Sequence, residues 1–425
     1  MSGDRLKVAF FVDNFYPQFN GVLTSYMNTV RELTRRGHEV LVVAPKIASK
    51  KRYDPKTFPY PLLYRRGIPA FFYPDFCVSW PFSLTSLLHT RRFAADIIHF
   101  HSPLTIAMQG ITTARLLGIP IVGTFHTFFA EREYLRVVGL EDCEWLVKAG
   151  WWYNNLFYNA CDVVVSPSRW TAAELRAHGV RPRIVVIPNG IEFSHYAGMG
   201  TKEKALPISL PEGAEIVLYV GRVSREKCLE VLVEAMVHLA EVRPRAHLVI
   251  VGDGPARGEL AELVRARGLE TKVIFTGFIR NEDLLSSGLL GAAKVFATPS
   301  TSENQPMTIL EAMIFGLPIV GVDARGVPEM IEGNGFVCPP GDARAMAARI
   351  HQILADEGLR ARMSAVSRRL AQEYSIEKTT DKLLLVYWEA IEERRRRLER
   401  AGPRLLRFGS AFPGRDFLPR LRRRR

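Results

Sequence analysis

Short apolar runs alternate along the chain with longer segments whose apolar residues recur at helical spacing, and this alternation occurs twice. Each run is short and bounded by turn residues, which is typical of a buried strand, while the intervening segments predict helices. Strands that alternate with helices favour a parallel sheet with helices on both faces, so we predict two doubly wound α/β domains. The runs cover residues 8–12, 39–43, 97–100, 119–124, 163–166 and 184–187, then 215–220, 246–251, 272–275, 295–298 and 336–337.

The two halves are separated by a segment without periodicity that is rich in Gly, Pro and charged residues. A length of 425 residues exceeds what one compact core usually holds, and 47% hydrophobic residues are enough for two cores. Residues 45–82, rich in Pro, aromatic and basic side chains, predict an irregular excursion. The predicted divisions are a first domain 1–192, a linker 193–214, a second domain 215–375, a helix 376–400 that crosses back to the first domain, and a basic tail 401–425.

Positive charge is concentrated at the carboxyl terminus. Residues 391–425 contain 13 arginines and four acidic residues, so they account for +9 of the net charge of +13. The remaining chain is nearly balanced and has no zinc finger, aromatic RNA-binding strand motif or basic zipper. We therefore do not expect a nucleic acid partner.

The composition also limits the compartment and the metal chemistry that we expect. The five cysteines are scattered and never form Cys-x-x-Cys, so neither a disulfide framework nor a zinc site is indicated. No apolar stretch reaches the roughly 20 residues that span a bilayer, and the amino terminus lacks the pattern of a cleavable signal. We expect a cytoplasmic protein.

Residues 294–321 contain the most informative chemistry. The apolar run 295–298 and the turn 299–302 lead into a helix that we expect to begin at Pro306 and to end before Gly316. Glu303 lies in the turn and Glu311 inside the helix. Because ligands of open parallel sheets bind beyond the carboxyl ends of strands, both acids are candidates for a ligand site. From these residues alone, a helix-stabilising Glu303 and a solvated Glu311 remain equal alternatives.

The wider pattern resembles a known family signature. Its residues are Glu303, Pro306, Leu310, Glu311, Ala312, Met313, Gly316 and Pro318. This pattern is similar to that of the retaining family 4 glycosyltransferases, which have the GT-B fold of two Rossmann-like domains facing across a cleft. The resemblance implies that Glu303 lies near the transferred sugar, that Glu311 holds the nucleotide ribose, and that the loop Asn304, Gln305, Pro306 and Met307 contributes to donor binding. Many members have Phe-Gly in this loop, and this chain departs from them there.

Two positions in the first half fit the same resemblance. Gly21 stands at a helix entrance, where a residue without a side chain permits a diphosphate to approach backbone N–H groups, although a special backbone angle explains it equally well. His126 follows a predicted strand within Thr124-Phe125-His126-Thr127. The tripeptide Phe-His-Thr resembles the family motif whose histidine contacts the donor sugar. The alternative is a histidine that only satisfies hydrogen bonds at the strand end.

The second half contains the expected phosphate ligands. Arg222 and Lys227 follow a predicted strand, and this spacing resembles the diphosphate site of the family. Gly252, in a turn after the next strand, corresponds to the glycine that family members place under the nucleotide. The backbone at Ile279 corresponds to their contact with the base.

His99 and His101 lie two residues apart at the end of a predicted strand, as two metal ligands would. No third ligand is near them in the sequence, so we favour packing and hydrogen bonding over a metal site. The chain also lacks Asp-x-Asp, so no metal and no other cofactor is implied.

Taken with the resemblance, these residues predict a retaining hexosyltransferase. We assign His126, Glu303, Arg222 and Lys227 to catalysis, and a UDP-linked hexose such as UDP-glucose as the donor. The expected acceptor is a lipid such as diacylglycerol, with a polysaccharide or a soluble acceptor as the alternative. An epimerase of the same fold or a non-catalytic sugar-nucleotide binder is the alternative of another class.

Two segments suggest peripheral contact with the inner face of the cell membrane. Residues 128–158 contain Trp145, Trp151, Trp152, Tyr153, Phe157 and Tyr158. Such residues suit the lipid headgroup level, but they suit a domain core equally. The arginine-rich tail fits an anionic lipid surface, and simple disorder of the tail is the alternative.

Overall fold

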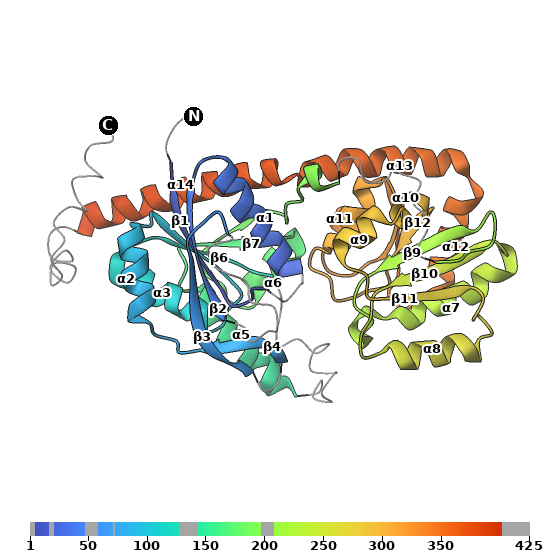
Figure 1. Ribbon diagram of the computed structural model, residues 1–425, viewed down its shortest axis with the longest axis horizontal. Helices are drawn as coiled ribbons and strands as arrows, with labels where there is room; N and C mark the ends of the chain where they lie inside the picture. The colour runs from blue at the N-terminus through green and yellow to red at the C-terminus, as the bar shows by residue number, and fades with distance from the viewer. Residues whose placement is uncertain are drawn as a thin grey trace.

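The computed structural model describes residues 5–16, 21–46, 58–70, 73–126, 143–196 and 208–401. Two α/β domains lie side by side, and a long carboxyl-terminal helix extends from the second domain back along the first (Figure 1). Both sheets are doubly wound, as the alternation in the sequence predicts.

The first domain is built on an eight-stranded sheet. Its strands are β1 (Lys7–Val12), β2 (Glu39–Lys46), β3 (Leu62–Ala70), β4 (Tyr73–Ser79), β5 (Ile97–His101), β6 (Ile121–Thr124), β7 (Val163–Ser166) and β8 (Arg183–Val186). They are ordered β4-β3-β2-β1-β5-β6-β7-β8, and all described pairs are parallel except β3 with β4. Its helices are α1 (Gly21–Arg35), α2 (Leu84–Phe93), α3 (Thr105–Leu117), α5 (Glu144–Tyr158) and α6 (Arg169–Ala177).

Strand β1 contributes to two cores because successive side chains of a strand point to opposite faces. Phe10 packs with residues of α1 and of the terminal helix α14 (Ile376–Ala401), whereas Phe11 packs with residues of α3, α5 and α6. Both phenylalanines are fully buried. The central strand therefore holds together helices on both faces of the sheet.

The prediction of an irregular excursion over 45–82 was wrong, because this stretch contains β3 and β4. Leu62 to Arg66 align in parallel with Val42 to Lys46 of β2, and Ile68 faces Val78 across an antiparallel hairpin. The hairpin lies at the edge of the sheet, where Pro and charged residues are tolerated because one side of the strand needs no partner. The apolar alternation is therefore too weak to be recognised in the sequence.

The second domain is built on a six-stranded parallel sheet in the order β11-β10-β9-β12-β13-β14. Its strands are β9 (Glu215–Val220), β10 (Ala246–Val251), β11 (Val273–Gly277), β12 (Val295–Ala297), β13 (Ile319–Val322) and β14 (Gly335–Cys338). Its helices are α7 (Leu229–Val242), α8 (Arg257–Ala266), α9 (Asn281–Ser286), α10 (Leu289–Ala292), α11 (Met307–Ile314), α12 (Ala343–Ala355) and α13 (Glu357–Ala371). Helices α7, α8 and α12 cover one face of the sheet, and α9, α10 and α11 cover the other.

Helix α11 begins at Met307, one residue later than predicted. Pro306 has an extended conformation and precedes the helix, and its carbonyl accepts a hydrogen bond from the N–H of Ile309. Gly316 follows the helix with a positive φ of 76°, the left-handed geometry that glycine adopts at helix ends.

The strand order reverses next to the first strand of each domain, between β1 and β5 and between β9 and β12. Ligands of doubly wound sheets bind at this position, beyond the carboxyl ends of the strands. In this chain the segments that follow these strands contain most of the candidate residues.

The two segments that pass between the domains meet at Ile191. Its N–H donates to the carbonyl of Tyr374, and its carbonyl accepts from the N–H of Ile376, each at 2.9 Å. Gly190 is required beside this contact, because a Cβ there would lie 2.2 Å from Oγ1 of Thr379. The end of the first domain and the start of α14 are therefore joined directly, and we name this contact of Ile191 with Tyr374 and Ile376 the hinge.

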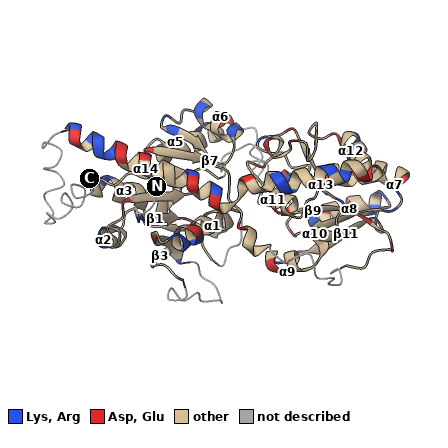
Figure 2. Cartoon of the chain, turned by 90° about the horizontal axis from the view of Figure 1, so that it is seen from above, with Lys and Arg blue, Asp and Glu red and all other residues tan. Residues whose placement is uncertain are grey.

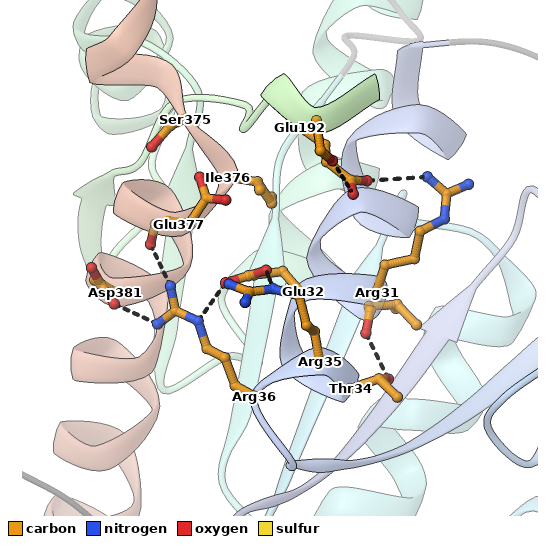
Figure 3. Close-up of polar contacts among 12 residues, drawn as sticks. Arg31, Glu32, Thr34, Arg35, Arg36, Glu192, Ser375, Ile376, Glu377 and Asp381 are labelled. Atoms are coloured by element: carbon orange, nitrogen blue, oxygen red, sulfur yellow. Dashed lines mark hydrogen bonds and ion pairs between the residues drawn. The ribbon is translucent and has the colours of Figure 1, made fainter. Parts of the chain in front are cut away.

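Helix α14 is attached to the first domain by buried apolar residues and by an arginine. Leu383, Val386 and Tyr387 join the core that contains Phe10. The guanidinium of Arg36 hydrogen-bonds to Glu32 of α1 and reaches across to Asp381 and to the carbonyl of Glu377 on α14 (Figure 3). Further along, acidic and basic residues interleave over the last turns of α14 (Figure 2). The glutamates therefore offset part of the positive charge of these turns.

Within the described residues, no helix is long and apolar enough to cross a membrane. The predicted basic tail beyond residue 401 and the part of the aromatic stretch before residue 143 lie outside the described residues.

Candidate functional site

The loop before α11 contacts the first domain. The Asn304 side-chain amide donates to the backbone carbonyl of His126 at 2.8 Å, and Oε1 of Gln305 accepts from the N–H of Asn189 at 2.6 Å. A Cβ on Gly21 would lie 3.8 Å from Cγ of Met307. The predicted donor residues of the two domains are thus neighbours across the domain boundary.

Lys227 and Glu303 form an ion pair at this boundary. The ammonium Nζ lies 2.6 Å from Oε1 of Glu303 and 3.3 Å from Oγ of Ser302, and both side chains of the pair are partly exposed. Lys227 ends the short 3-10 helix Arg225–Lys227, and Glu303 follows β12. Glu303 therefore binds a cation and does not cap the start of α11, so the interpretation as a helix-stabilising residue does not hold.

Arg222 and Gly252 follow β9 and β10. Arg222 is exposed, and its carbonyl accepts a hydrogen bond from the Tyr219 hydroxyl. Gly252 has a φ of 142°, and a Cβ there would lie 1.8 Å from the carbonyl oxygen of Gly221. The close approach of these two turns requires glycine at position 252, whatever binds above it.

Glu311 lies inside α11 and is buried, so it is not a solvated helix residue. Its carboxylate accepts hydrogen bonds from Nδ2 of Asn281 at 2.9 Å and from the hydroxyl of Tyr196 at 3.4 Å. Burial raises the pKa of Glu311 to about 7, and these two hydrogen bonds oppose the rise. Asn281 begins α9 two residues after Ile279, so Glu311 and the predicted base contact lie on the same side of the domain.

The imidazole of His126 contacts a second histidine, His101. Its Nε2 lies 2.8 Å from Nδ1 of His101, and the two rings stack with centroids 5.1 Å apart. Burial lowers the pKa of His126 to about 4, so the imidazole is neutral near pH 7. The ring of His126 is therefore oriented by a specific partner that the sequence did not suggest.

His99 is a packed and hydrogen-bonded residue, as we favoured. Its Nδ1 lies 2.6 Å from the hydroxyl of Tyr387, and its Nε2 lies 2.6 Å from Oγ1 of Thr124. Burial lowers its pKa to about 3. In the part of the chain that the structure describes, no cluster of three His, Cys, Asp or Glu residues is arranged to hold a metal ion.

Asp13 is a buried carboxylate of the first domain that we did not select from the sequence. Its oxygens accept hydrogen bonds from the N–H groups of Ile106 at 2.7 Å and Ala107 at 3.0 Å, at the start of α3. Burial raises its pKa to about 7 despite these bonds. An acid directly after an apolar strand is the signal that would have identified it.

Glu329 forms a second contact between the domains. Its carboxylate accepts hydrogen bonds from the N–H groups of Arg169 at 2.9 Å and Trp170 at 2.7 Å, at the start of α6. A carboxylate at this end of a helix is favourable because the first N–H groups have no partner within the helix. Glu329 thus ties the second domain to a helix of the first.

The described part of the aromatic stretch divides between the two interpretations. Phe157 and Tyr158 are buried in the first domain, and Trp151 stacks on His178. Trp145 and Trp152 expose 67% and 68% of their surface. Packing therefore explains one side of α5 and leaves two tryptophans exposed.

Two doubly wound α/β domains that lie side by side with these groups near the carboxyl ends of their strands have the arrangement of the GT-B fold. The chain has the same fold as the solved structure of Anabaena HepE in complex with UDP, at 19% identity with a TM-score of 0.69 over 90% of this chain and 100% of that one. It is likewise similar to sucrose-phosphate synthase from Thermosynechococcus elongatus, at 20% identity with a TM-score of 0.71 over 92% of this chain and 100% of that one.

The sequence comparisons identify the family. Residues 19–195 match the model of Glycosyltransferase Family 4, and residues 201–370 match that of glycosyl transferases group 1. The chain belongs to the family 4 glycosyltransferases, and it is a hexosyltransferase.

Curated relatives cover most of the chain at moderate identity. A sulfoquinovosyl transferase of Arabidopsis thaliana is 27% identical over 397 residues, which are 89% of this chain and 72% of the relative. An alpha-monoglucosyldiacylglycerol synthase of Streptococcus pneumoniae is 27% identical over 76% of this chain and 72% of its own length. A GDP-mannose-dependent alpha-mannosyltransferase of Mycolicibacterium smegmatis is 27% identical over 85% of this chain and 93% of its own length.

Proposed function

We propose that the chain is a retaining glycosyltransferase that moves a hexose from a nucleotide diphosphate sugar to a lipid acceptor such as diacylglycerol at a membrane surface. The observation that carries this proposal is the ion pair of Lys227 with Glu303, which lies beside the loop that contacts His126 of the other domain. This arrangement offers a cation, a carboxylate and a neutral imidazole to one ligand between the domains.

In this proposal each part of the donor has its own ligand. Arg222 and Lys227 bind the diphosphate, and Glu311 binds the two ribose hydroxyls, which suits a buried carboxylate with two oxygens. The backbone at Ile279 contacts the base. Glu303 and His126 face the sugar, with the loop from Asn304 to Met307 beside it and Gly21 leaving room for the phosphates.

The chemical step places negative charge on the diphosphate. The bond between the anomeric carbon and the phosphate oxygen breaks, and the leaving diphosphate takes the electron pair. The acceptor oxygen attacks from the same face and passes its proton to the departing phosphate. Arg222 and Lys227 stabilise the developing charge, which is where electrostatic catalysis has its largest effect. The proposal includes no divalent metal, because the sequence has no Asp-x-Asp to bind one beside the diphosphate.

The choice of a UDP-linked donor and a lipid acceptor draws on the relatives. Two of them are alpha-monoglucosyldiacylglycerol synthases, from Streptococcus pneumoniae and Acholeplasma laidlawii, and the Anabaena structure contains UDP-glucose. The relatives named for GDP-mannose make that sugar nucleotide the second donor to test.

An exposed apolar surface of the first domain supports a membrane acceptor. We name it the hairpin surface, because it comprises residues of the β3–β4 hairpin and of the segment that continues into α2. Its members are Ile68, Val78, Trp80, Phe82, Leu84 and Leu88, each at least 40% exposed. Ile68 and Val78 lie opposite each other across the hairpin, and Leu84 and Leu88 are one turn apart on α2. Contiguous exposed apolar patches mark interaction sites. The exposed Arg91 and Arg92 at the end of α2 add positive charge that suits anionic lipid.

The decisive experiment supplies the full chain with vesicles of phosphatidylglycerol and diacylglycerol and with radiolabelled UDP-glucose or GDP-mannose. We expect label in the organic phase and an α-linked product by NMR. Absence of label from the organic phase with both donors would exclude the lipid acceptor. Interconversion of the sugar nucleotide without any acceptor would instead indicate an epimerase.

A double variant and one control variant test the hairpin surface. Trp80→Ser with Leu84→Ser removes two exposed apolar side chains, and we expect about tenfold less product on vesicles, because each buried apolar side chain contributes up to a few kcal/mol. UDP affinity should not change. Leu116→Ser is the control, because Leu116 is an apolar residue near the end of α3 that is 68% exposed but is not part of the hairpin surface. Equal losses in both variants would contradict a role for the hairpin surface.

A further inference from the structure

His101 is a buried histidine whose role is not explained by the donor site. Only 4% of its surface is exposed, and its ring is surrounded by the rings of Phe10, Tyr26 and His99 at centroid distances of 5.7, 5.3 and 4.3 Å. These contacts fix the plane of its imidazole. Through its Nδ1 it fixes one nitrogen of His126, at 2.8 Å.

The contact between the two histidines leaves His126 with a single nitrogen for a ligand. A neutral imidazole has one N–H donor and one acceptor nitrogen. Burial lowers the pKa of both His101 and His126, so both rings are neutral near pH 7. One of the two facing nitrogens therefore donates and the other accepts, and this choice decides whether Nδ1 of His126 donates to a ligand or accepts from it.

The surroundings of Nε2 of His101 indicate which of its two ring nitrogens carries the proton. Nε2 of His101 is buried and has no hydrogen-bond partner among the described residues. His101 lines a cavity of about 30 Å³ near the hinge, together with Ser25, Thr29 and Thr379. A volume of roughly 10–15 Å³ accommodates the centre of one water molecule, so water fits in this cavity.

Three of the four hydroxyl groups that line the cavity, those of Ser25, Thr29 and Thr379, use their hydrogens elsewhere. Ser25 donates to Oδ1 of Asn189 at 2.8 Å, Thr29 donates to the carbonyl of Ser25 at 3.3 Å, and Thr379 donates to the carbonyl of Ile376 at 3.2 Å. These hydroxyls therefore present lone pairs to the cavity. A water molecule in this cavity can therefore give its two hydrogens to these oxygens and accept the N–H of His101.

We propose that His101 is a positioning residue for His126: it carries its proton on Nε2, accepts the Nε2–H of His126 on Nδ1, and leaves Nδ1 of His126 as a hydrogen-bond acceptor for a ligand hydroxyl. His126 then accepts from a sugar hydroxyl and cannot donate to it. The identity of that ligand as the donor sugar rests on the proposed function, whereas the proton positions do not.

The proton positions are tested directly by NMR of the full chain labelled with ¹⁵N in its histidine rings. We expect both His101 and His126 to carry hydrogen on Nε2 and to show an unprotonated Nδ1 near pH 7. A proton on Nδ1 of His126 would overturn the proposal. This measurement needs no activity, so it decides the inference even if the chain transfers no sugar.

Three substitutions of His101 test the consequence for transfer. His101→Asn places an amide oxygen near the former Nδ1, where it accepts from His126, so we expect turnover within about threefold of the wild type. His101→Gln places its amide toward the cavity, and His101→Phe keeps the ring volume without an acceptor. For both we expect kcat to fall about ten- to a hundredfold, since an orienting hydrogen bond to a reacting group has this weight, with unchanged UDP affinity.

A comparison of the variants distinguishes a positioning role of His101 from a purely structural role. Equal activity of the Asn and Phe variants, whether both are high or both are low, would overturn the proposal. His238→Phe on α7 is the control for replacing a partly buried histidine and should leave kcat unchanged. Thermal unfolding with and without UDP shows whether each variant is folded. For a variant that does not fold, the NMR measurement on the wild type gives the answer.

Discussion

The two domains supply different chemistry to the same site. The second domain presents a charged pair, Lys227 with Glu303, whose side chains are 15% and 23% exposed. The first domain presents His126, whose ring is neutral and is oriented by the buried His101. In the proposed function, Lys227 meets the diphosphate from a position near water, whereas His126, which accepts one hydrogen bond from the sugar, is held by the core of the first domain.

The two domains also differ in how far apart in the sequence their site residues lie. Glu303, the loop that follows it and Glu311 lie within one segment of nine residues, and Lys227 comes from the segment that follows β9, the strand next to β12. The histidines and Asp13 come from different strands, and Asp13 reaches the backbone of α3, 93 residues further along the chain. The second domain is therefore where single substitutions should act most directly on catalysis.

Replacing the charged pair has the largest expected effect. We expect Lys227→Met to lower kcat by about a hundred- to a thousandfold, because removing one group that stabilises transition-state charge has this weight. Glu303→Gln should act similarly. In the double variant the losses should not add, because the two side chains are in direct contact. Steady-state kinetics with the donor identified by the vesicle experiment provide the measurement.

Arg225 provides the control for this experiment. It lies two residues before Lys227 and pairs with Glu259 at 2.6 Å, with both side chains more than 60% exposed. Arg225→Met should leave kcat within about twofold, since exposed ion pairs contribute little. Full activity of Lys227→Met, or an equal loss in Arg225→Met, would show that the ion pair of Lys227 with Glu303 has no special role in catalysis. The proposed difference between the two domains would then be wrong.

The sequence predicted the parts of the molecule whose signal is local. The alternation of strands and helices predicted both sheets, because buried parallel strands are short apolar runs. Glu303, Glu311, Arg222 and Lys227 were selected as candidates because they follow strands within recognisable motifs. The edge hairpin β3–β4 was not found, because its Pro and Arg residues interrupt the apolar run that its buried partner β2 shows clearly.

The remaining contacts of the site depend on tertiary structure. His101 faces His126 because β5 and β6 are aligned with His101 opposite Thr124. Glu311 meets Tyr196 from the segment between the domains and Asn281 from α9. None of these pairs is close in sequence, so no spacing rule predicts them, and their energetic weight has to be measured.

The pH dependence of stability provides a measurement of the buried acid in the second domain. Glu311 has a pKa of about 7 in the folded chain against an ordinary value of 4.5. Between these values the unfolded chain has released the proton and the folded chain has not. Rising pH therefore favours unfolding, and the free energy of unfolding falls by about 3 kcal/mol before it levels above pH 7, at 1.36 kcal/mol per unit of pKa.

Urea unfolding at pH 5, 6, 7 and 8 tests this, with Glu311→Gln as the comparison. The variant has no carboxyl group to titrate at this position, so its stability relative to the wild type should increase from pH 5 to pH 8. Asp13, whose pKa is also about 7, contributes equally to both proteins and cancels in the difference. If the free energies of unfolding of the two proteins depend on pH in the same way, the pKa of Glu311 is not raised by folding. Its burial would then have no effect on its titration.

The smallest expected effect concerns the hinge, where Arg31 of α1 and Arg36, which directly follows this helix, provide a matched pair. Arg36 joins Glu32 to two groups of α14, and its side chain is 22% exposed, whereas Arg31 lies 3.9 Å from Glu192 and is 42% exposed (Figure 3). Arg36→Met should lower the free energy of unfolding by about 1–2 kcal/mol, because it breaks charge-assisted hydrogen bonds that are partly buried. Arg31→Met should have almost no effect. Hydrogen exchange should quicken in α14 of the Arg36 variant first, because α14 loses its polar attachment there. An equal effect of the two substitutions would mean that apolar packing alone holds α14 on the first domain.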